Sequence, residues 1–181
     1  SGAAYSQKGF ELAAQQIRRE HGGQIELIYK DTQSNPQTSV SIFRELSTGE
    51  MPHVTIMQLS SVTRAIKPML NKNTLAIASA VAIPDIAAPE KYLYRVFFSS
   101  GEMGEAASSY ALDNQKSTAA VVYVNDDYGR TSMQSFKSSF EARGGTVVST
   151  ESFALSQNSF RTQWEKLLSG PPDALWVTGY G

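Results

Sequence analysis

Cysteine is absent from the sequence. Its absence excludes a disulfide framework, a cysteine-ligated metal and a thiol nucleophile. Histidine is scarce, occurring only at His21 and His53, and neither has a nucleophile nearby in the topology predicted below. Lysine and arginine number 16 against 17 acidic residues, so the net charge of −1 offers no electrostatic attraction for nucleic acid or an anionic membrane surface.

The sequence also lacks long apolar runs and the short motifs of common catalytic sites. No run approaches the length of a membrane span. There is no G-x-S-x-G nucleophile elbow, no G-x-x-x-x-G-K-[ST] phosphate loop and no G-x-G-x-x-G after a strand. These absences make an enzyme the least favoured class, and we expect no catalytic residue, metal or cofactor.

What the sequence does contain is a regular alternation of helical and strand-like segments. Apolar residues at helical spacing and short apolar runs follow one another, with glycine and proline at many of the boundaries. Helices are predicted over 7–20, 36–48, 60–70, 103–114, 128–143 and 156–169. Strands are predicted over 24–30, 53–59, 74–80, 92–98, 117–127, 146–153 and 173–181.

This alternation predicts βαβ units and parallel sheets, hence an α/β fold with doubly wound, Rossmann-like lobes. The polar stretch from Asn114 to Thr118 is the predicted boundary, giving a first lobe over 1–116 and a second over 117–181. Because the first predicted element is a helix and the last is a bare strand, we expect both lobes to be incomplete in this chain.

Ligands of open parallel sheets bind outside the carboxyl ends of the strands, at the turns that enter helices. One such turn, "LSSVT", places Ser60, Ser61 and Thr63 where a strand gives way to a helix. Serine or threonine there is usually only a helix cap. The free N–H groups of a helix start also attract anions, so a seat for a carboxylate is the second interpretation, which the position after a strand strengthens without placing it above the cap.

A second turn, "NDDYGR", is predicted at the equivalent place in the second lobe. Tyr128 there either presents its ring to a ligand or covers the end of the sheet. Asp126 and Asp127 are most simply helix-start charges, with a metal or ammonium site as the alternative.

The chain resembles the type I periplasmic substrate-binding proteins of ABC transporters, and most of all the branch that binds leucine, isoleucine and valine. The resemblance covers nearly the whole chain and is carried by an ordered set of segments: "SGAAYSQKGFELAAQQIRREHGGQIELIYKDTQSNP", "LSSVT", "IPDI", "YLYRVFFSSGEMGEAASSYAL", "AAVVYVNDDYGR" and "PDALWVTGY". It implies two α/β lobes that close on a ligand about a hinge.

The resemblance also implies which residues touch the ligand. Ser60 and Ser61, with Thr63 just inside the helix, match the turn that holds the ligand's α-carboxylate. Ala82 stands where the family usually has a threonine, so a hydroxyl is missing there, while backbone groups from Ala80 to Ala82 remain available. This departure widens the expected ligands from amino acids to aromatic or aliphatic acids and amides.

In the second lobe, Tyr128 matches the residue that covers the ligand on closure, and Tyr180 falls near another contact of the family. The acid that pairs with a ligand ammonium in the family would follow Gly181.

The resemblance therefore implies a solute-binding protein, periplasmic or extracellular and with or without a lipid anchor, that delivers a carboxylate-bearing solute to an ABC permease. The alternative is a ligand-sensing domain of a signalling receptor with the same fold. We further expect that a chain of this extent, expressed alone, self-associates through uncovered sheet edges and apolar faces.

Overall fold

The computed structural model describes residues 2–49 and 51–180, so residues 1 and 181, the outer ends of the two predicted lobes, lie outside it. The chain divides into two compact units, of which one ends at Asp31 and the other runs from Thr32 to Tyr180. Each unit is described by itself.

The first unit consists of helix α1, Gly2–His21, and an extended segment. Gly22, with a φ of 68°, ends the helix by donating its N–H to the Arg18 carbonyl at 3.0 Å. The strand predicted over 24–30 is not formed. These residues lie back along α1, where the Tyr29 hydroxyl donates to the Gln7 carbonyl at 3.4 Å and the Arg18 guanidinium donates to the Ile25 carbonyl. Extended chain without a hydrogen-bonded neighbouring strand is not a strand of a sheet.

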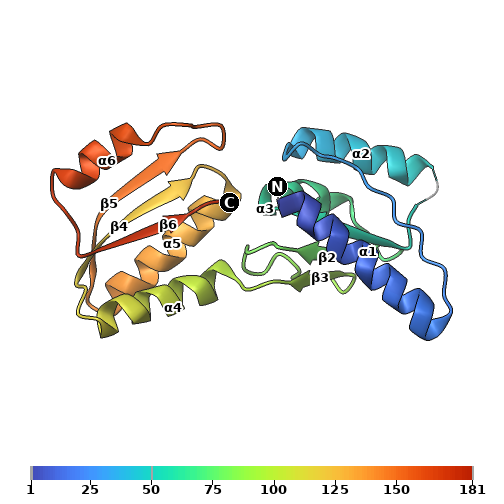
Figure 1. Ribbon diagram of the computed structural model, residues 1–181, viewed down its shortest axis with the longest axis horizontal. Helices are drawn as coiled ribbons and strands as arrows, with labels where there is room; N and C mark the ends of the chain where they lie inside the picture. The colour runs from blue at the N-terminus through green and yellow to red at the C-terminus, as the bar shows by residue number, and fades with distance from the viewer. Residues whose placement is uncertain (1, 50, 181) are drawn as a thin grey trace. The chain divides into compact units, whose positions relative to one another are not determined.

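The second unit contains two parallel sheets and their helices (Figure 1). Its elements in chain order are α2 Pro36–Thr48, β1 Val54–Gln58, α3 Ser60–Ile66, the 3₁₀ turn η1 Lys67–Met69, β2 Leu75–Ser79, β3 Leu93–Val96, α4 Ser100–Asp113, β4 Thr118–Val124, α5 Asp127–Ala142, β5 Thr146–Phe153, α6 Arg161–Leu168 and β6 Ala174–Thr178.

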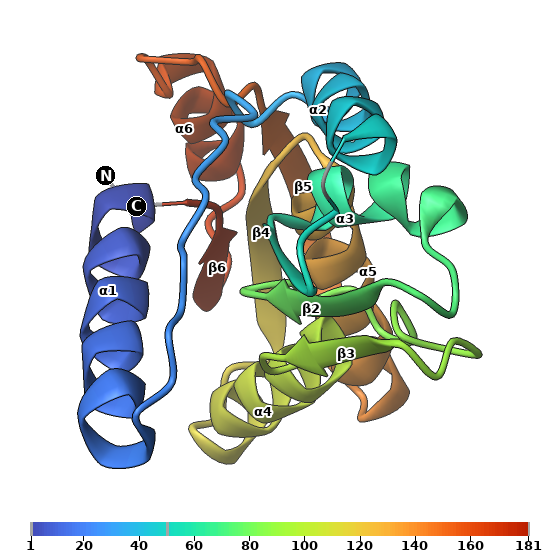
Figure 2. The same cartoon turned by 90° about the vertical axis from the view of Figure 1, so that its right-hand side faces the viewer.

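The first sheet has the strand order β1-β2-β3, with every pair parallel. Helices α2 and α3 lie on one side of it (Figure 2). As predicted, Asn35 begins α2: its Oδ1 accepts from the N–H groups of Gln37 and Thr38, at 2.8 and 3.2 Å. Pro68 falls in η1, so the α-helical part of the segment ends at Ile66, consistent with the missing proline N–H.

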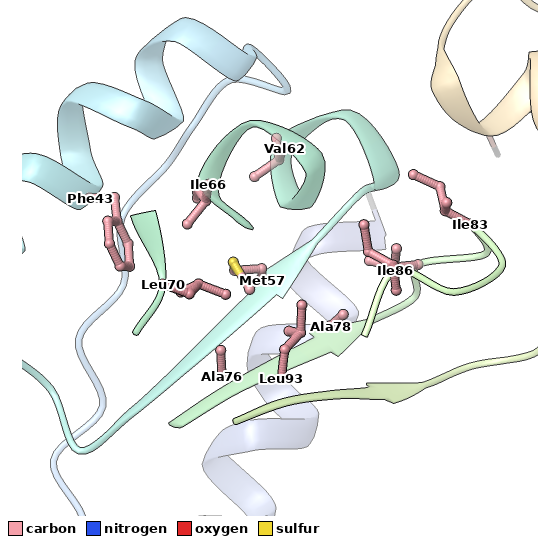
Figure 3. Close-up of a cluster of buried hydrophobic side chains, with 11 residues drawn as sticks. Phe43, Met57, Val62, Ile66, Leu70, Ala76, Ala78, Ile83, Ile86 and Leu93 are labelled. Atoms are coloured by element: carbon pink, nitrogen blue, oxygen red, sulfur yellow. The ribbon is translucent and has the colours of Figure 1, made fainter. Parts of the chain in front are cut away.

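Figure 3 shows the core between these helices and the sheet, where Val62 and Ile66 of α3 and Phe43 of α2 gather above the strands. Small residues line the strand surface beneath them, since Ala76 and Ala78 are fully buried. These short side chains let α3 pack close to the sheet. The start of α3 lies at the carboxyl end of β1 because only Leu59 separates the two elements.

The second sheet has the strand order β5-β4-β6, again parallel throughout. Helices α4 and α5 cover one face, where Phe136 and Phe140 of α5 form the centre of the core. Helix α6 covers the other face through Leu167. β4 is consequently buried on both faces, which explains its continuous apolar sequence.

Three predicted helix starts are wrong. α1, predicted from residue 7, begins at Gly2. α4 begins at Ser100, three residues early, because Ser99 and Glu102 form a capping box there. α6 begins only at Arg161, and Ser156 lies instead in a turn closed by a hydrogen bond from the Gln157 N–H to the Ala154 carbonyl, at 2.9 Å. Trp164 is half exposed, because α6 covers the sheet with Leu167.

The prediction of an α/β fold with parallel sheets is confirmed. The lobe ranges 1–116 and 117–181 stay a prediction; within the second unit, α4 packs against α5 and so joins the second sheet. Among the described residues, no helix is both long and apolar enough to cross a bilayer.

Candidate functional site

The turn between β1 and α3 (residues 59–63), called here the serine turn, is built differently from the prediction. The residue that caps α3 is Leu59, with φ 70° and ψ 137°, and no side chain caps the helix. A positive φ at a leucine is uncommon, and it turns the chain straight from strand into helix. Ser60 and Ser61 therefore become the first two residues of α3 rather than its cap.

The hydroxyls of the serine turn fall into two kinds. Ser60 is 1% exposed and Ser61 half-buried, and within the described chain neither hydroxyl has a hydrogen-bond partner. Thr63 is fully buried, and its Oγ1 donates to the Leu59 carbonyl at 2.9 Å. Thr63 thus fixes the turn from inside, whereas the two serines leave their hydroxyls free.

The backbone of the serine turn also keeps donors free. The first N–H that bonds within the helix is that of Thr63, which donates to the Leu59 carbonyl at 3.1 Å. Because the first N–H groups of a helix have no partner inside it, those of Ser60 to Val62 remain open. Free N–H groups, two hydroxyls and a positive helix end together suit a carboxylate.

The loop after β2 contributes differently at Ala80 and at Ala82. Ala80 is exposed and left-handed, with φ 56°. Ala82 is 1% exposed, and its carbonyl accepts from the Ser100 N–H at 2.7 Å, which joins this loop to the start of α4. The Ala82 carbonyl is therefore already used within the fold.

The turn between β4 and α5 (residues 125–130), called here the tyrosine turn, is capped by Asp126. Its Oδ1 accepts from the Gly129 N–H at 2.9 Å, as the helix-start interpretation predicts. Gly129 is required by close packing, since a Cβ there would lie 1.8 Å from the Val124 carbonyl oxygen. The glycine lets the first turn of α5 rest directly on the end of β4.

Two predicted site residues meet at the tyrosine turn. The rings of Tyr128 and Tyr180 lie with centroids 5.3 Å apart and planes tilted by 32°. The Tyr180 hydroxyl donates to Asp126 Oδ2 at 2.7 Å. Burial, followed by this hydrogen bond to a carboxylate, raises the pKa of the Tyr180 phenol far above its ordinary value. The phenol therefore remains a neutral donor to Asp126 at physiological pH.

An ion pair joins the serine turn's helix to the tyrosine turn. Nε of Arg64, one helical turn after Ser60, lies 3.0 Å from Oδ2 of Asp127, the first residue of α5. Oδ1 of Asp127 lies 3.0 Å from Nη2 of Arg130. The structure thus brings together two turns that belong to different sheets (Figure 1).

Sequence reasoning missed Arg64 and the second role of Asp126. Helical spacing was the signal for Arg64, because it follows Ser60 by four residues and residues at that spacing lie on the same face of a helix. Nothing local signals the contact between Asp126 and Tyr180, which are 54 residues apart. In the described ranges, no group of three or more histidines, aspartates or glutamates could hold a metal.

Comparisons with known proteins show a family and a fold for the chain. The family model described as "Periplasmic binding protein" matches residues 1–181. No curated protein matches the chain. Among solved structures, a substrate-binding protein of a branched-chain amino acid transporter from Streptococcus pneumoniae, in complex with isoleucine, is 24% identical with a TM-score of 0.85 over 96% of this chain and 51% of that one.

Two further structures have the same fold. A leucine-binding protein from Thermotoga maritima is 24% identical, with a TM-score of 0.82 over 92% of this chain and 50% of that one. A solute-binding protein of an ABC transporter from Rhodopseudomonas palustris, in complex with p-hydroxybenzoic acid, is 22% identical, with a TM-score of 0.85 over 96% of this chain and 50% of that one. The chain thus spans about half the length of the structures it matches.

Proposed function

The chain belongs to the periplasmic binding protein family, and we propose on that premise that it is part of the solute-binding component of an ABC uptake system. Its solute is a small carboxylate-bearing molecule, held between the serine turn and the tyrosine turn. The protein binds this solute without converting it and passes it to a permease. Its place is the periplasm or the outer face of the cell, where a lipid anchor would keep it close to that permease.

The observation that carries this proposal is the pairing of Arg64 with Asp127, at 3.0 Å. It sets the carboxyl ends of two parallel sheets opposite each other, which is the arrangement a ligand between two sheets requires. One of the facing turns has open donors at Ser60 and Ser61, and the other has the rings of Tyr128 and Tyr180.

The chemistry of the solute is inferred from what these groups can bind. The open groups of the serine turn are N–H and O–H donors, which bind a carboxylate better than a cation. Isoleucine and p-hydroxybenzoic acid, the molecules named with two of the similar structures, differ in size, shape and charge but share a carboxylate. Binding of the carboxylate at Ser60 and Ser61 would be a feature shared by both kinds of solute.

Calorimetry on the full-length protein tests the proposal with pairs of acids and their amides, such as p-hydroxybenzoate with p-hydroxybenzamide and L-isoleucine with L-isoleucinamide. The panel extends to other amino acids and aromatic acids. For the acid that binds, we expect its amide to bind at least about 100-fold more weakly, because the charge that strengthens each hydrogen bond is lost. Binding of no acid in the panel, or equal binding of an acid and its amide, would contradict the proposal.

A further inference from the structure

Asp126 does two things at once, one with each carboxylate oxygen. Oδ1 caps α5 by accepting from the Gly129 N–H at 2.9 Å. Oδ2 accepts from the Tyr180 hydroxyl at 2.7 Å. Capping alone needs only one oxygen, and a serine at this position would supply it. The second contact is therefore not explained by helix formation.

The path of the chain after β6 shows that Tyr180 is held in place. Thr178, the last residue of β6, pairs with Tyr123 of β4. At Gly179, a Cβ would lie 2.9 Å from Cζ of Phe153, so the chain passes close against that ring. The Tyr180 ring then lies beside Tyr128, and the bond to Asp126 fixes its far end. Ring and hydroxyl are thus fixed by separate contacts.

The neighbouring acid cannot replace Asp126 in this role. Asp127 has Arg64 on one oxygen and Arg130 on the other, each at 3.0 Å. Every carboxylate oxygen of the tyrosine turn therefore already has a partner within the fold. What this turn presents to a solute is the pair of aromatic rings.

We propose that Asp126 is a positioning residue, which holds Tyr180 beside Tyr128 so that the two rings form a wall suited to the ring of an aromatic acid. This role deepens the proposed function and rests on it: the serine turn takes the carboxylate and the two tyrosines take the ring. Aromatic rings gain from tilted or offset packing against one another, at centroid distances like that of this pair. The side chain of a branched aliphatic amino acid lacks that interaction.

Three substitutions separate the positioning role from the capping role. Asp126→Ser keeps an N-cap but is too short to reach Tyr180, so it removes only the second contact. Tyr180→Phe removes the same contact from the other side and leaves the cap intact. Asp126→Asn keeps both, since its amide oxygen can accept from the Gly129 N–H while its NH2 group donates to the phenol oxygen of Tyr180. Ser99→Ala, which removes a cap from α4 alone, is the matched control for lost helix stability.

Binding is measured by calorimetry in the full-length protein with p-hydroxybenzoate and L-isoleucine as probes. We expect Asp126→Ser and Tyr180→Phe to weaken p-hydroxybenzoate binding about tenfold, and Asp126→Asn to restore it to within about threefold of the wild type. L-isoleucine should bind more weakly than p-hydroxybenzoate and change less. Ser99→Ala should lower the melting temperature without changing either affinity.

A second readout needs no ligand. Aromatic NMR spectra of tyrosine-labelled protein report the mutual ring-current shifts of Tyr128 and Tyr180, whose signals are assigned by their loss in the corresponding phenylalanine variants. Asp126→Ser should move both sets of signals toward those of free tyrosine, whereas Asp126→Asn should leave them in place. The reason is that only the serine variant releases the Tyr180 ring.

The two readouts distinguish failure of this role from failure of the proposed function. Unmoved ring signals in Asp126→Ser overturn the positioning role. So does unchanged p-hydroxybenzoate affinity in Tyr180→Phe, or an equal loss for L-isoleucine. Moved ring signals in a protein that binds no carboxylate at all would support the positioning role and overturn the proposed function.

Discussion

The serine turn and the tyrosine turn differ in how far their polar side chains are paired within the fold. In the serine turn, no side chain caps the helix, and the hydroxyls of Ser60 and Ser61 are unpaired within the described chain. In the tyrosine turn, Asp126 caps the helix and binds Tyr180, while Asp127 is paired with two arginines.

This difference indicates that the two turns have different roles. The open donors of the serine turn can take a polar group of a solute as their partner. Polar groups already paired hold their surroundings rigid instead. The serine turn is therefore suited to recognising charge, and the tyrosine turn to providing a fixed apolar surface.

The largest expected effect concerns the rigidity of the tyrosine turn. Gly129→Ala places a Cβ 1.8 Å from the Val124 carbonyl oxygen, a backbone atom that cannot move aside without shifting β4. We expect the free energy of unfolding to fall by about 3 kcal/mol or more, measured by chemical denaturation. Gly101→Ala is the control, because its Cβ would meet only Ser99 Oγ at an ordinary 3.6 Å. An equal stability in both variants would show that the tyrosine turn is not tightly packed.

The next effect concerns the open donors of the serine turn. The double substitution Ser60→Ala and Ser61→Ala removes both hydroxyls and leaves the N–H groups in place. We expect the affinity for the bound acid to fall about 10- to 100-fold, measured by calorimetry on the full-length protein. Ser41→Ala, an exposed serine of α2, should leave the affinity unchanged. Unchanged affinity in the double variant would remove the serine turn from the site.

A third substitution separates the two kinds of hydroxyl within the serine turn. Thr63→Val loses the bond from Oγ1 to the Leu59 carbonyl, which is 2.9 Å long and fully buried. We expect a loss of about 1 kcal/mol of unfolding free energy and a change in affinity below about threefold. Thr63→Ser should retain the stability, since it keeps the hydroxyl. If Thr63→Val weakens binding as much as the double serine variant, Thr63 itself contacts the solute.

The smallest effect concerns the ion pair that joins the turns. Arg64 is 55% exposed, so water screens its pairing with Asp127. We expect Arg64→Gln to change the affinity by the equivalent of less than about 1 kcal/mol, and to make the affinity less sensitive to salt. Arg161→Gln breaks a pair with Glu165 that is more exposed, and should leave the salt dependence as in the wild type. An Arg64→Gln variant with the same salt dependence would show that the pair does not couple the turns.

Much of the fold could be predicted because it depends on local patterns. Buried strands such as β4 are continuous in apolar character, and Asn35 before Pro36 marks the start of a helix by its chemistry. Local signals were also overlooked, since Ser99 and Glu102 are spaced as a capping box requires. The segment 24–30 has the composition of a strand but pairs with no neighbouring strand in the part of the chain that the structure describes, and local patterns do not reveal this.

The candidate site was predictable only in part. The position of the serine turn follows from the order of elements, but the cap at Leu59 depends on a backbone angle that leucine rarely adopts. The link from Tyr180 to Asp126 depends on how β6 ends beside β4, a tertiary relation that no local pattern contains. Whether the seven predicted residues contact a solute stays a prediction.

The most direct test of the account is a crystal structure of the full-length protein with its bound acid. We expect the carboxylate to lie within about 3 Å of the donors of Ser60 and Ser61, with the rest of the molecule against the rings of Tyr128 and Tyr180. A carboxylate turned toward the tyrosine turn, or bound away from both turns, would contradict the account.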